Sequence, residues 1–264
     1  MIKLVVFDID GTLIPYSTHK LAEETKQAIK LLQKKQIKVA IATGRQYKAI
    51  NKDLIKLNFD YYLCGNGSYI CDTNGVVLFK DEISDDDINA LTEDFIKYNY
   101  PFVLRYSCGS YEANPNISII KYSQRFFSEK QLQELSQYIL STKPQNEKPY
   151  ACLCHIEEEN FSKISSKYKH LKFVITGNGV LCDINLIRTN KGTSLRKLCN
   201  YLNVDISQTM AFGDDENDVE MIKCSGIGIA MKNSVNKVKN SADYITDTCE
   251  NLGVLKALKK YSIV

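Results

Sequence analysis

The chain opens with an apolar run that ends on an acidic residue. Residues 1–7 are apolar apart from Lys3, and Asp8 follows them directly. A short continuous apolar run predicts a strand that is buried on both faces of a parallel sheet. Residues 37–42 and 61–63 form similar runs, and apolar spacing at three and four residues predicts a helix over residues 22–35. Strands and helices that alternate in this way favour a parallel sheet with helices on both faces.

The pattern changes after the third run. Residues 68–80 read as two strands around Asn74-Gly75, the strongest short hairpin signal. The next hundred residues mix helices with short strands, which indicates an inserted α+β domain over residues 81–184. The expected helices there are 85–98, 129–140 and 158–170, and the expected strands are 102–106, 150–156, 173–176 and 180–184.

The first pattern resumes at Lys191. A helix over residues 194–202 leads to a strand over residues 209–212. The remaining expected elements of this type are a helix at 47–57 and short elements at 219–223, 226–230, 235–239, 244–245 and 252–259. We therefore expect an α/β fold with a doubly wound, Rossmann-like parallel-sheet core of residues 1–80 and 185–264, into which the α+β cap domain is inserted.

Composition narrows the class of partner. The chain has 264 residues, 44% of them hydrophobic, and a net charge of +3, which is ordinary for a globular protein. Short lysine runs are expected at helix ends, where cations favour the dipole, so no nucleic-acid partner is predicted. The chain shows neither a signal peptide nor a run of membrane-spanning length, and its nine cysteines are scattered, so we expect a cytoplasmic protein without a membrane partner. The pattern makes no prediction about the oligomeric state.

Polar residues that suit phosphoryl transfer follow the predicted strands. Asp8 offers a nucleophilic carboxylate, and Asp10, two residues on, is close enough to act as a general acid and base. Thr43 offers a hydroxyl to phosphate oxygens, and Gly44 allows close approach. Lys191 opens a helix, so that its ammonium and the helix N-terminus both favour an anion.

A further acidic segment follows the strand at residues 209–212. Asp214, Asn217 and Asp218 supply oxygen ligands of the kind that Mg²⁺ prefers. The segment lacks the alternating ligands and the distal glutamate of a calcium-binding EF-hand loop. These residues therefore predict a magnesium site.

These segments together resemble the haloacid dehalogenase-like superfamily of phosphohydrolases. Within it, the chain is similar to the Cof-type subgroup (type IIB), whose α/β cap is inserted between the second and third motifs. Cys64-Gly65-Asn66-Gly67 also looks like the Asn-Gly turn of this subgroup. The matching segments are Asp8-Ile9-Asp10-Gly11-Thr12, Ala42-Thr43-Gly44-Arg45, Asn190-Lys191-Gly192 and Gly213-Asp214-Asp215-Glu216-Asn217-Asp218.

The resemblance implies a role for each residue of these motifs. Asp8 would be the nucleophile and a Mg²⁺ ligand, and Asp10 would be the general acid/base and would reach the metal through its backbone carbonyl. Asp214 would ligate the metal directly, with Asp218 supporting it. The residues that would bind the phosphoryl group are Thr43, Gly44, Lys191 and Asn217.

The expected function is that of a Mg²⁺-dependent phosphatase that acts on a small phosphorylated metabolite through an aspartyl-phosphate. Sugar phosphates, nucleotides and cofactor phosphates all stay open as substrates, because the discriminating surface lies in the cap. One alternative is a sugar phosphomutase, which an assay of isomer formation against phosphate release separates. Another is a non-catalytic sensor of phosphorylated metabolites, which has no need of both Asp8 and Asp10.

Several residues carry two interpretations each. Arg45 binds substrate near the site or caps the helix that follows it. Cys152, Cys154 and His155 suggest zinc, yet alternation along a strand places His155 on the opposite face, so buried free thiols are favoured. Candidate substrate contacts in the cap, with ordinary surface positions as the alternative, are Arg105, Tyr106 and Asn178.

Overall fold

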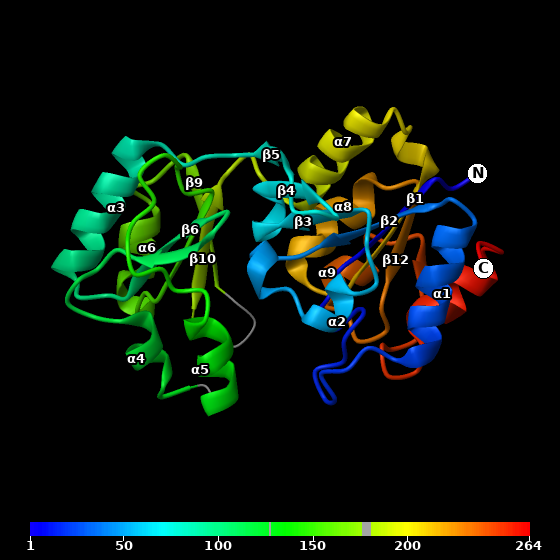
Figure 1. Cartoon of the computed structure of the whole chain (residues 1–264), viewed down its shortest axis with the longest axis horizontal. Coiled ribbons are helices and arrows are strands. Elements are labelled where there is room, and N and C mark those ends of the chain that lie inside the picture. Colours follow the sequence, from blue (N-terminus) through cyan, green and yellow to red (C-terminus); the bar gives the residue numbers. More distant parts are fainter. Residues whose placement is uncertain (127, 176–180) are drawn as a thin grey trace. The chain divides into compact units, whose positions relative to one another are not determined.

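A computed structural model describes residues 1–126, 128–175 and 181–264 of the chain. The chain divides into two compact units, each of which is discontinuous in sequence (Figure 1). The first unit comprises residues 1–44, 51–79 and 190–264, and the second comprises residues 45–50 and 80–189.

These boundaries differ from the expected ones by one residue at Lys80, which belongs to the second unit, and in two longer stretches. Residues 185–189 belong to the second unit, because the strand Cys182–Leu186 pairs along its whole length with its neighbour. Residues 45–50 also belong to the second unit, where the Ser110 hydroxyl donates a hydrogen bond of 3.0 Å to Oε1 of Gln46. Neither difference is visible in local sequence patterns, since both depend on pairing with distant residues.

A mixed sheet forms the centre of the first unit. In the described residues its order is β13-β12-β11-β1-β2-β3-β4-β5, and the pairs from β13 to β3 are parallel. The carboxyl ends of β11, β1 and β2 therefore lie side by side at one edge of the sheet. The strands are β1 (Leu4–Phe7), β2 (Lys38–Ala42), β3 (Tyr61–Cys64), β4 (Tyr69–Asp72), β5 (Val77–Lys80), β11 (Thr209–Gly213), β12 (Ile227–Ala230) and β13 (Tyr244–Ile245).

Helices cover both faces of this sheet, as the sequence predicts for a doubly wound fold. Leu4 and Val6 of β1 lie in one apolar cluster with buried residues of α7, α8 and α9, while α1 and α10 lie on the opposite side (Figure 1). Alternating side chains of one strand thus serve two cores. The helices are α1 (Glu23–Lys34), α2 (Lys52–Ile55), α7 (Lys191–Leu202), α8 (Val219–Cys224), α9 (Asn236–Lys239) and α10 (Gly253–Lys260).

The second unit is an antiparallel sheet with helices on both faces. Its order in the described residues is β7-β6-β8-β10-β9. Phe102 and Leu104 pack with α3 and α6 on one face, and Val103 and Leu153 pack with Ile119 on the other. The elements are α3 (Asp85–Lys97), β6 (Phe102–Tyr106), β7 (Gly109–Glu112), α4 (Ile119–Ser123), α5 (Glu129–Ser136), β8 (Ala151–Cys154), α6 (Glu158–Ser165), β9 (Leu171–Ile175) and β10 (Cys182–Leu186).

One predicted helix is wrong. Residues 47–57 do not form a continuous helix but a 3-10 turn, Tyr47–Ala49, followed by the short α2. Ile50 has an extended backbone with a ψ of 134°, and the Asn51 side chain accepts a hydrogen bond from the backbone of Asp53 and starts a new helix. A local N-cap therefore interrupts the apolar periodicity.

Some predictions within the second unit also need correction. The sequence pattern predicts neither β7 nor α4. Tyr106 is a core residue with 1% exposure instead of a surface residue or a substrate contact. Tyr106 shares the face of β6 that carries Phe102 and Leu104, which explains its burial. Residues 176 and 180 at the ends of two predicted strands, and the candidate Asn178, lie outside the described residues. Cys152 and Cys154 are buried free thiols, as expected.

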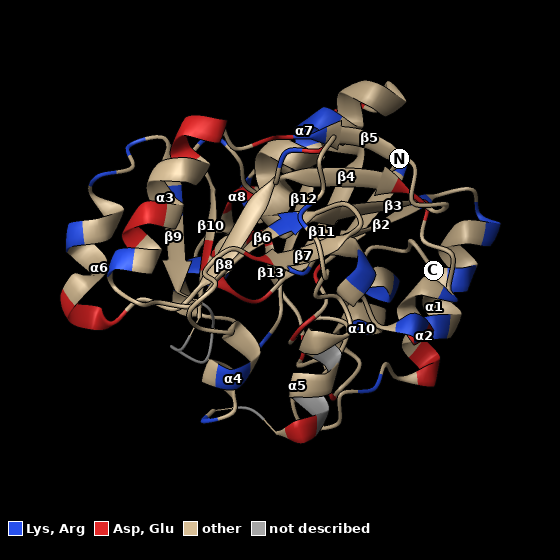
Figure 2. Ribbon diagram, turned by 60° about the vertical axis from the view of Figure 1, so that its left-hand side comes forward, with Lys and Arg blue, Asp and Glu red and all other residues tan. Residues whose placement is uncertain are grey.

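Charged residues follow the helix dipoles. Acidic residues occupy the first turn and lysine the last turn of α1, α3 and α6 (Figure 2). Lys34-Lys35 ends α1 and Lys259-Lys260 ends α10, so these lysine runs lie at helix ends, as the sequence predicts. Among the helices of the described residues, none is long and apolar enough to cross a membrane.

Candidate active site

The carboxyl end of β1 presents Asp8 in a buried position. Asp8 is 6% exposed, and its backbone N–H still donates to the Phe212 carbonyl, at 3.0 Å, so the strand pairing fixes its location. Gly11 then turns the chain with a φ of 82°, and a Cβ there would overlap the Asp214 carboxylate. Only glycine allows this approach, which brings the Thr12 hydroxyl within 2.8 Å of Asp214 Oδ1. The end of β1 and the end of β11 thus form one site.

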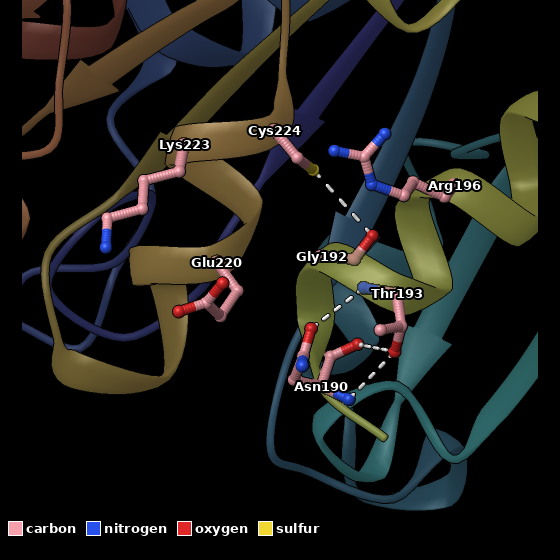
Figure 3. A pocket seen from close by; sticks show the side chains of 7 residues that line it. All are labelled: Asn190, Gly192, Thr193, Arg196, Glu220, Lys223 and Cys224. Carbon is pink, nitrogen blue, oxygen red and sulfur yellow. Dashed lines mark hydrogen bonds between the residues drawn. The ribbon is translucent and has the colours of Figure 1, made fainter. Parts of the chain in front are cut away.

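Lys191 lies at the centre of the site with only 1% of its surface exposed. Its Nζ is 2.6 Å from Oδ1 of Asp8 and 2.6 Å from Oδ1 of Asp218. A capping box places the lysine there, because the Asn190 side chain accepts from the Thr193 N–H and the Thr193 hydroxyl accepts from the Asn190 N–H (Figure 3).

Gly192 brings the start of α7 close to α8. A Cβ on Gly192 would lie 2.5 Å from the Glu220 carbonyl oxygen, so a larger residue would push the two helices apart. Beside this contact, a small pocket opens between the two helices (Figure 3). The residues that line it are Asn190, Gly192, Thr193, Arg196, Glu220, Lys223 and Cys224. The carboxylates of the site are not among them.

Asp218 uses both oxygens within the protein. Oδ1 accepts from Lys191, and Oδ2 accepts from the backbone N–H groups of Asp214 and Asp215 at 2.9 and 3.0 Å. Asp218 therefore ties the loop after β11 to the lysine. One oxygen each of Asp8, Asp214 and Asp218 lie within 4.8 Å of one another, which makes a group that could hold a metal ion.

The site carries more negative charge than Lys191 balances. Burial is the largest influence on Asp8 and raises its pKa well above the ordinary value, and Lys191 opposes this only in part. Burial and then the Asp218 carboxylate raise the pKa of Asp214 to about 7. Burial lowers the pKa of Lys191, but Asp218 and Asp8 together outweigh burial and raise it. A divalent cation bound by oxygen ligands fits this excess of acid.

A second group of polar residues gathers beside the acids. Thr43 follows β2 and is buried, and its backbone N–H donates to the Leu63 carbonyl at 2.8 Å. Asn217 donates from Nδ2 to Oδ1 of Asn66 at 2.9 Å, and a Cβ on Gly44 would lie 3.1 Å from the same oxygen. The structure thus brings the expected phosphate-binding segments at residues 43–44 and 217 together through Asn66.

Asn66, Tyr16 and Asn233 were not predicted as site residues. For Asn66, the sequence indicates only a place in a turn. The Tyr16 hydroxyl donates to the Asp10 carbonyl at 3.2 Å, and Nδ2 of Asn233 donates to the Gly11 carbonyl at 3.0 Å. The sequence marks the turn around Asn66 but not its contact with Asn217, and it marks neither Tyr16 nor Asn233. The contacts of Asn66 and Asn233 join segments 151 and 222 residues apart, so they depend on the fold.

The two candidate arginines have partners inside the second unit. Nη1 of Arg45 donates to the Ala49 carbonyl at 3.4 Å, in the 3-10 turn that stands where a continuous helix was expected. Nη1 of Arg105 lies 3.0 Å from Oδ1 of Asp183 across the sheet. The side chains of Arg105 and Asp183 are both largely buried.

Nearly the whole chain matches one known family. The family of haloacid dehalogenase-like hydrolases matches residues 5–258. The chain belongs to this family. Individual proteins of known structure or name also align with it over nearly their whole length, at 25–27% identity.

The chain is 27% identical over 269 residues to the 5-amino-6-(5-phospho-D-ribitylamino)uracil phosphatase YcsE of Bacillus subtilis, covering 98% of this chain and 96% of YcsE. A solved phosphatase of the superfamily from Bacteroides thetaiotaomicron superposes with a TM-score of 0.84 at 26% identity, covering 100% of this chain and 96% of the other. A solved subclass IIB sugar phosphatase superposes with a TM-score of 0.83 at 25% identity, covering 99% of this chain and 100% of the other.

These matches confirm the resemblance to the Cof-type subgroup and the doubly wound core with a cap domain. They also make the protein a phosphoric monoester hydrolase, because the family is one of hydrolases and the full-length relatives are phosphatases. A divalent metal is typical of the family, and the buried acids provide a group that suits one.

Proposed function

We propose that the protein hydrolyses the phosphate ester of a small metabolite through an aspartyl-phosphate on Asp8, with Mg²⁺ as its cofactor. One observation carries the proposal. The buried Nζ of Lys191 lies 2.6 Å from both Asp8 and Asp218, next to a third acid, Asp214. A buried lysine that faces a surplus of carboxylates supports a site that takes up further positive charge and a phosphoryl group.

Asp8 supplies the nucleophile. One of its carboxylate oxygens attacks phosphorus, and the bond between phosphorus and the substrate's ester oxygen breaks. Lys191 favours the ionised form of Asp8, because its ammonium lies within hydrogen-bonding distance of that carboxylate. The product of this step is a phosphorylated Asp8 and an alcohol.

Asp10 handles the proton in both steps. As a carboxylic acid it protonates the departing ester oxygen, and as the resulting carboxylate it takes a proton from the water that attacks the aspartyl-phosphate. The second step breaks the bond between phosphorus and Asp8 and returns Asp10 to its protonated form. Atoms and protons balance, since water and ester become alcohol and inorganic phosphate.

The remaining polar residues bind the phosphoryl group. Thr43 and Asn217 would donate hydrogen bonds to phosphate oxygens, and Gly44 leaves room for their approach. Lys191 would add a cation that offsets charge between the acids and the phosphate. Donors fixed in advance by the fold stabilise the charge that develops on phosphorus without reorganising.

Asp8, the Asp10 carbonyl and Asp214 would hold the magnesium ion, and Asp218 would support them. Asp218 is assigned the supporting role because both of its oxygens already accept hydrogen bonds within the protein. When bound, the ion would offset the repulsion between the acids and the phosphate. The protein's own contribution is a rigid set of oxygen ligands, since Thr12 holds Asp214 from the side.

The full-length relatives support a sugar or sugar-alcohol phosphate as the first substrates to test. YcsE is named for a phosphoribityl compound, and the solved subclass IIB relative is named a sugar phosphatase. Both names describe a phosphate on a polyhydroxylated chain or ring. Nucleotides and cofactor phosphates belong in the same panel, which is read by release of inorganic phosphate.

Replacement of the nucleophile tests the proposal. Asp8→Asn should lower hydrolysis of p-nitrophenyl phosphate in Mg²⁺ by at least about a thousandfold, because the amide cannot form the covalent intermediate. The thermal unfolding midpoint should not fall, since a buried charge is removed. Asp53→Asn is the matched control, because Asp53 lies on the surface of α2 with its side chain 68% exposed. Substantial turnover by Asp8→Asn would contradict the nucleophile assignment.

A further inference from the structure

Asn66 joins two segments of the proposed phosphate site. It is 8% exposed, and its Oδ1 accepts the hydrogen bond from Nδ2 of Asn217. The same oxygen faces Gly44, where a Cβ would come within 3.1 Å of it. Residues 44, 66 and 217 come from three separate stretches of the chain, all in the first unit. The amide of Asn66 therefore lies at the point where the phosphate-binding segments meet.

The backbone holds Asn66 in this position. Its φ of 55° is in the left-handed region, which asparagine tolerates better than other residues with a side chain. Its N–H donates to the Thr43 carbonyl at 3.0 Å. The adjacent Gly67 approaches the start of α7, where a Cβ would lie 2.5 Å from the Asn190 carbonyl oxygen. The turn Gly65–Gly67 thus contacts the segment that carries Lys191 as well.

We propose that Asn66 is a positioning residue that orients the side-chain amide of Asn217 toward the transferring phosphoryl group. Oδ1 of Asn66 can only accept a hydrogen bond, so it selects the Nδ2 end of Asn217. An amide nitrogen carries two N–H groups in one plane, and the bond to Asn66 uses one of them. The second N–H is then directed at a fixed angle, as a donor to a phosphate oxygen. The inference rests on the proposed function, because it takes Asn217 as a phosphate ligand.

A purely structural role for Asn66 makes a different prediction. If Asn66 only stabilises its turn, its loss lowers the thermal midpoint but leaves phosphate affinity unchanged in the folded protein. It also acts independently of Asn217. A double-mutant cycle separates the two roles, since residues that act as a unit are not additive.

The cycle uses Asn66→Gly, Asn217→Ala and the double variant. Glycine keeps the left-handed backbone and removes only the side chain. The measured quantities are kcat and KM for p-nitrophenyl phosphate in Mg²⁺, the inhibition constant of inorganic phosphate, and the thermal midpoint. Each single variant should raise KM and the inhibition constant about tenfold, the effect of one hydrogen bond to a charged group. The changes in kcat should be smaller, because ground state and transition state both use the contact.

The double variant should show no greater loss than either single variant. A change of less than twofold in Asn66→Gly, or effects that multiply in the double variant, would overturn the proposal. Asn58→Gly is the matched control, because Asn58 also has a left-handed backbone, with a φ of 53°, and is exposed. Its phosphate inhibition constant should equal that of the unaltered protein.

A measurement on the unaltered protein covers the case in which Asn66→Gly does not fold. In ¹⁵N-labelled protein, the side-chain amide signals of Asn217 are those that vanish in Asn217→Ala. Inorganic phosphate with Mg²⁺ should shift one of the two amide protons, while the proton bonded to Asn66 moves little. Equal shifts of both protons, or none, would overturn the proposal. Phosphate binding is measured here without turnover, so failure of the nucleophile assignment and failure of this inference give separate results.

Discussion

Each unit of the molecule buries a cation against carboxylates, but the two arrangements differ in their charge balance. In the second unit, Nη1 of Arg105 lies 3.0 Å from the carboxylate of Asp183. The first unit places Lys191 at 2.6 Å from two carboxylates, Asp8 and Asp218, with a third close by. The ion pair in the sheet joins one cation to one carboxylate, whereas the site at the strand ends groups three acids of the described residues around one lysine.

This difference distinguishes the ion pair in the sheet from the proposed active site. A buried ion pair with matched charges satisfies itself and needs no ligand, although its net stabilisation is small. The acids of an unmatched cluster have raised pKa values. Burial first, and then the Asp218 carboxylate, raise the pKa of Asp214 to about 7. Such a cluster gains from a bound cation. Because the charges of both groups are buried, the charge balance, and not the burial, distinguishes the proposed active site from the ion pair in the sheet.

Removal of the lysine should have the largest effect. Lys191→Met should lower phosphatase activity by at least about a hundredfold and destabilise the metal-free protein by about 3–5 kcal/mol, because Asp8 and Asp218 lose their cation. The raised pKa of the acids means that the folded state binds protons more tightly than the unfolded state. The variant therefore loses stability as the pH rises above the ordinary pKa of aspartate and regains it as the pH falls.

Phosphate release measures the activity, and urea unfolding measures the stability. Both are followed between roughly pH 5 and pH 8, where proteins are commonly most stable. Lys30→Met is the control, because Lys30 is exposed in the interior of α1 and should change neither quantity. If Lys191→Met is as stable as the unaltered protein at every pH, Lys191 does not offset the charge of Asp8 and Asp218.

The pair in the second unit should respond differently to single and double replacement. Arg105→Met should destabilise the protein by about 3 kcal/mol, because it leaves the buried carboxylate of Asp183 without its cation. Combining it with Asp183→Leu should restore most of the stability, since a matched pair can be replaced by apolar side chains at little cost. Urea unfolding of the three variants measures this recovery. If the double variant is less stable than Arg105→Met, Asp183 stabilises the protein through contacts other than the one with Arg105.

Magnesium should stabilise the site at the strand ends but not the Arg105–Asp183 pair, and this change in stability is smaller than those of the two replacements above. At a concentration of one hundred times its dissociation constant, Mg²⁺ should stabilise the protein by about 2.7 kcal/mol and raise the thermal midpoint by roughly 5–10 °C. Asp214→Asn should remove most of this increase, whereas Arg105→Met should keep it. Calorimetry with and without a chelator provides the measurement. Equal responses in both variants would argue against a cation site at the strand ends.

The sequence was sufficient for features that depend on local pattern. Apolar runs followed by polar residues predicted that Asp8, Thr43 and Asp214 follow strands of a parallel sheet, and they do. The helix expected at residues 47–57 failed, because the Asn51 cap outweighs the apolar spacing around it. β7 was missed because Gly109–Glu112 lacks apolar alternation and is recruited by its pairing with β6.

Contacts between distant segments were beyond the reach of pattern. Lys191 donates hydrogen bonds to Asp8 and Asp218, which are 183 and 27 residues away from it along the chain. The bond between Asn66 and Asn217 spans 151 residues. A turn sequence predicts the shape of its own backbone, but not which side chain will approach it from another loop. The fold determines these partners, and the sequence determines the fold only as a whole.

The central place of β1 in its sheet has a consequence for synthesis of the protein. β1 pairs with β2 on one side and with β11, from Thr209 onward, on the other. At about 5–20 residues per second, roughly 10–40 s separate translation of Asp8 from translation of β11. The antiparallel sheet of the second unit is encoded entirely within that interval. We expect the nascent chain to complete its second unit first and to keep β1 half-paired until β11 leaves the ribosome.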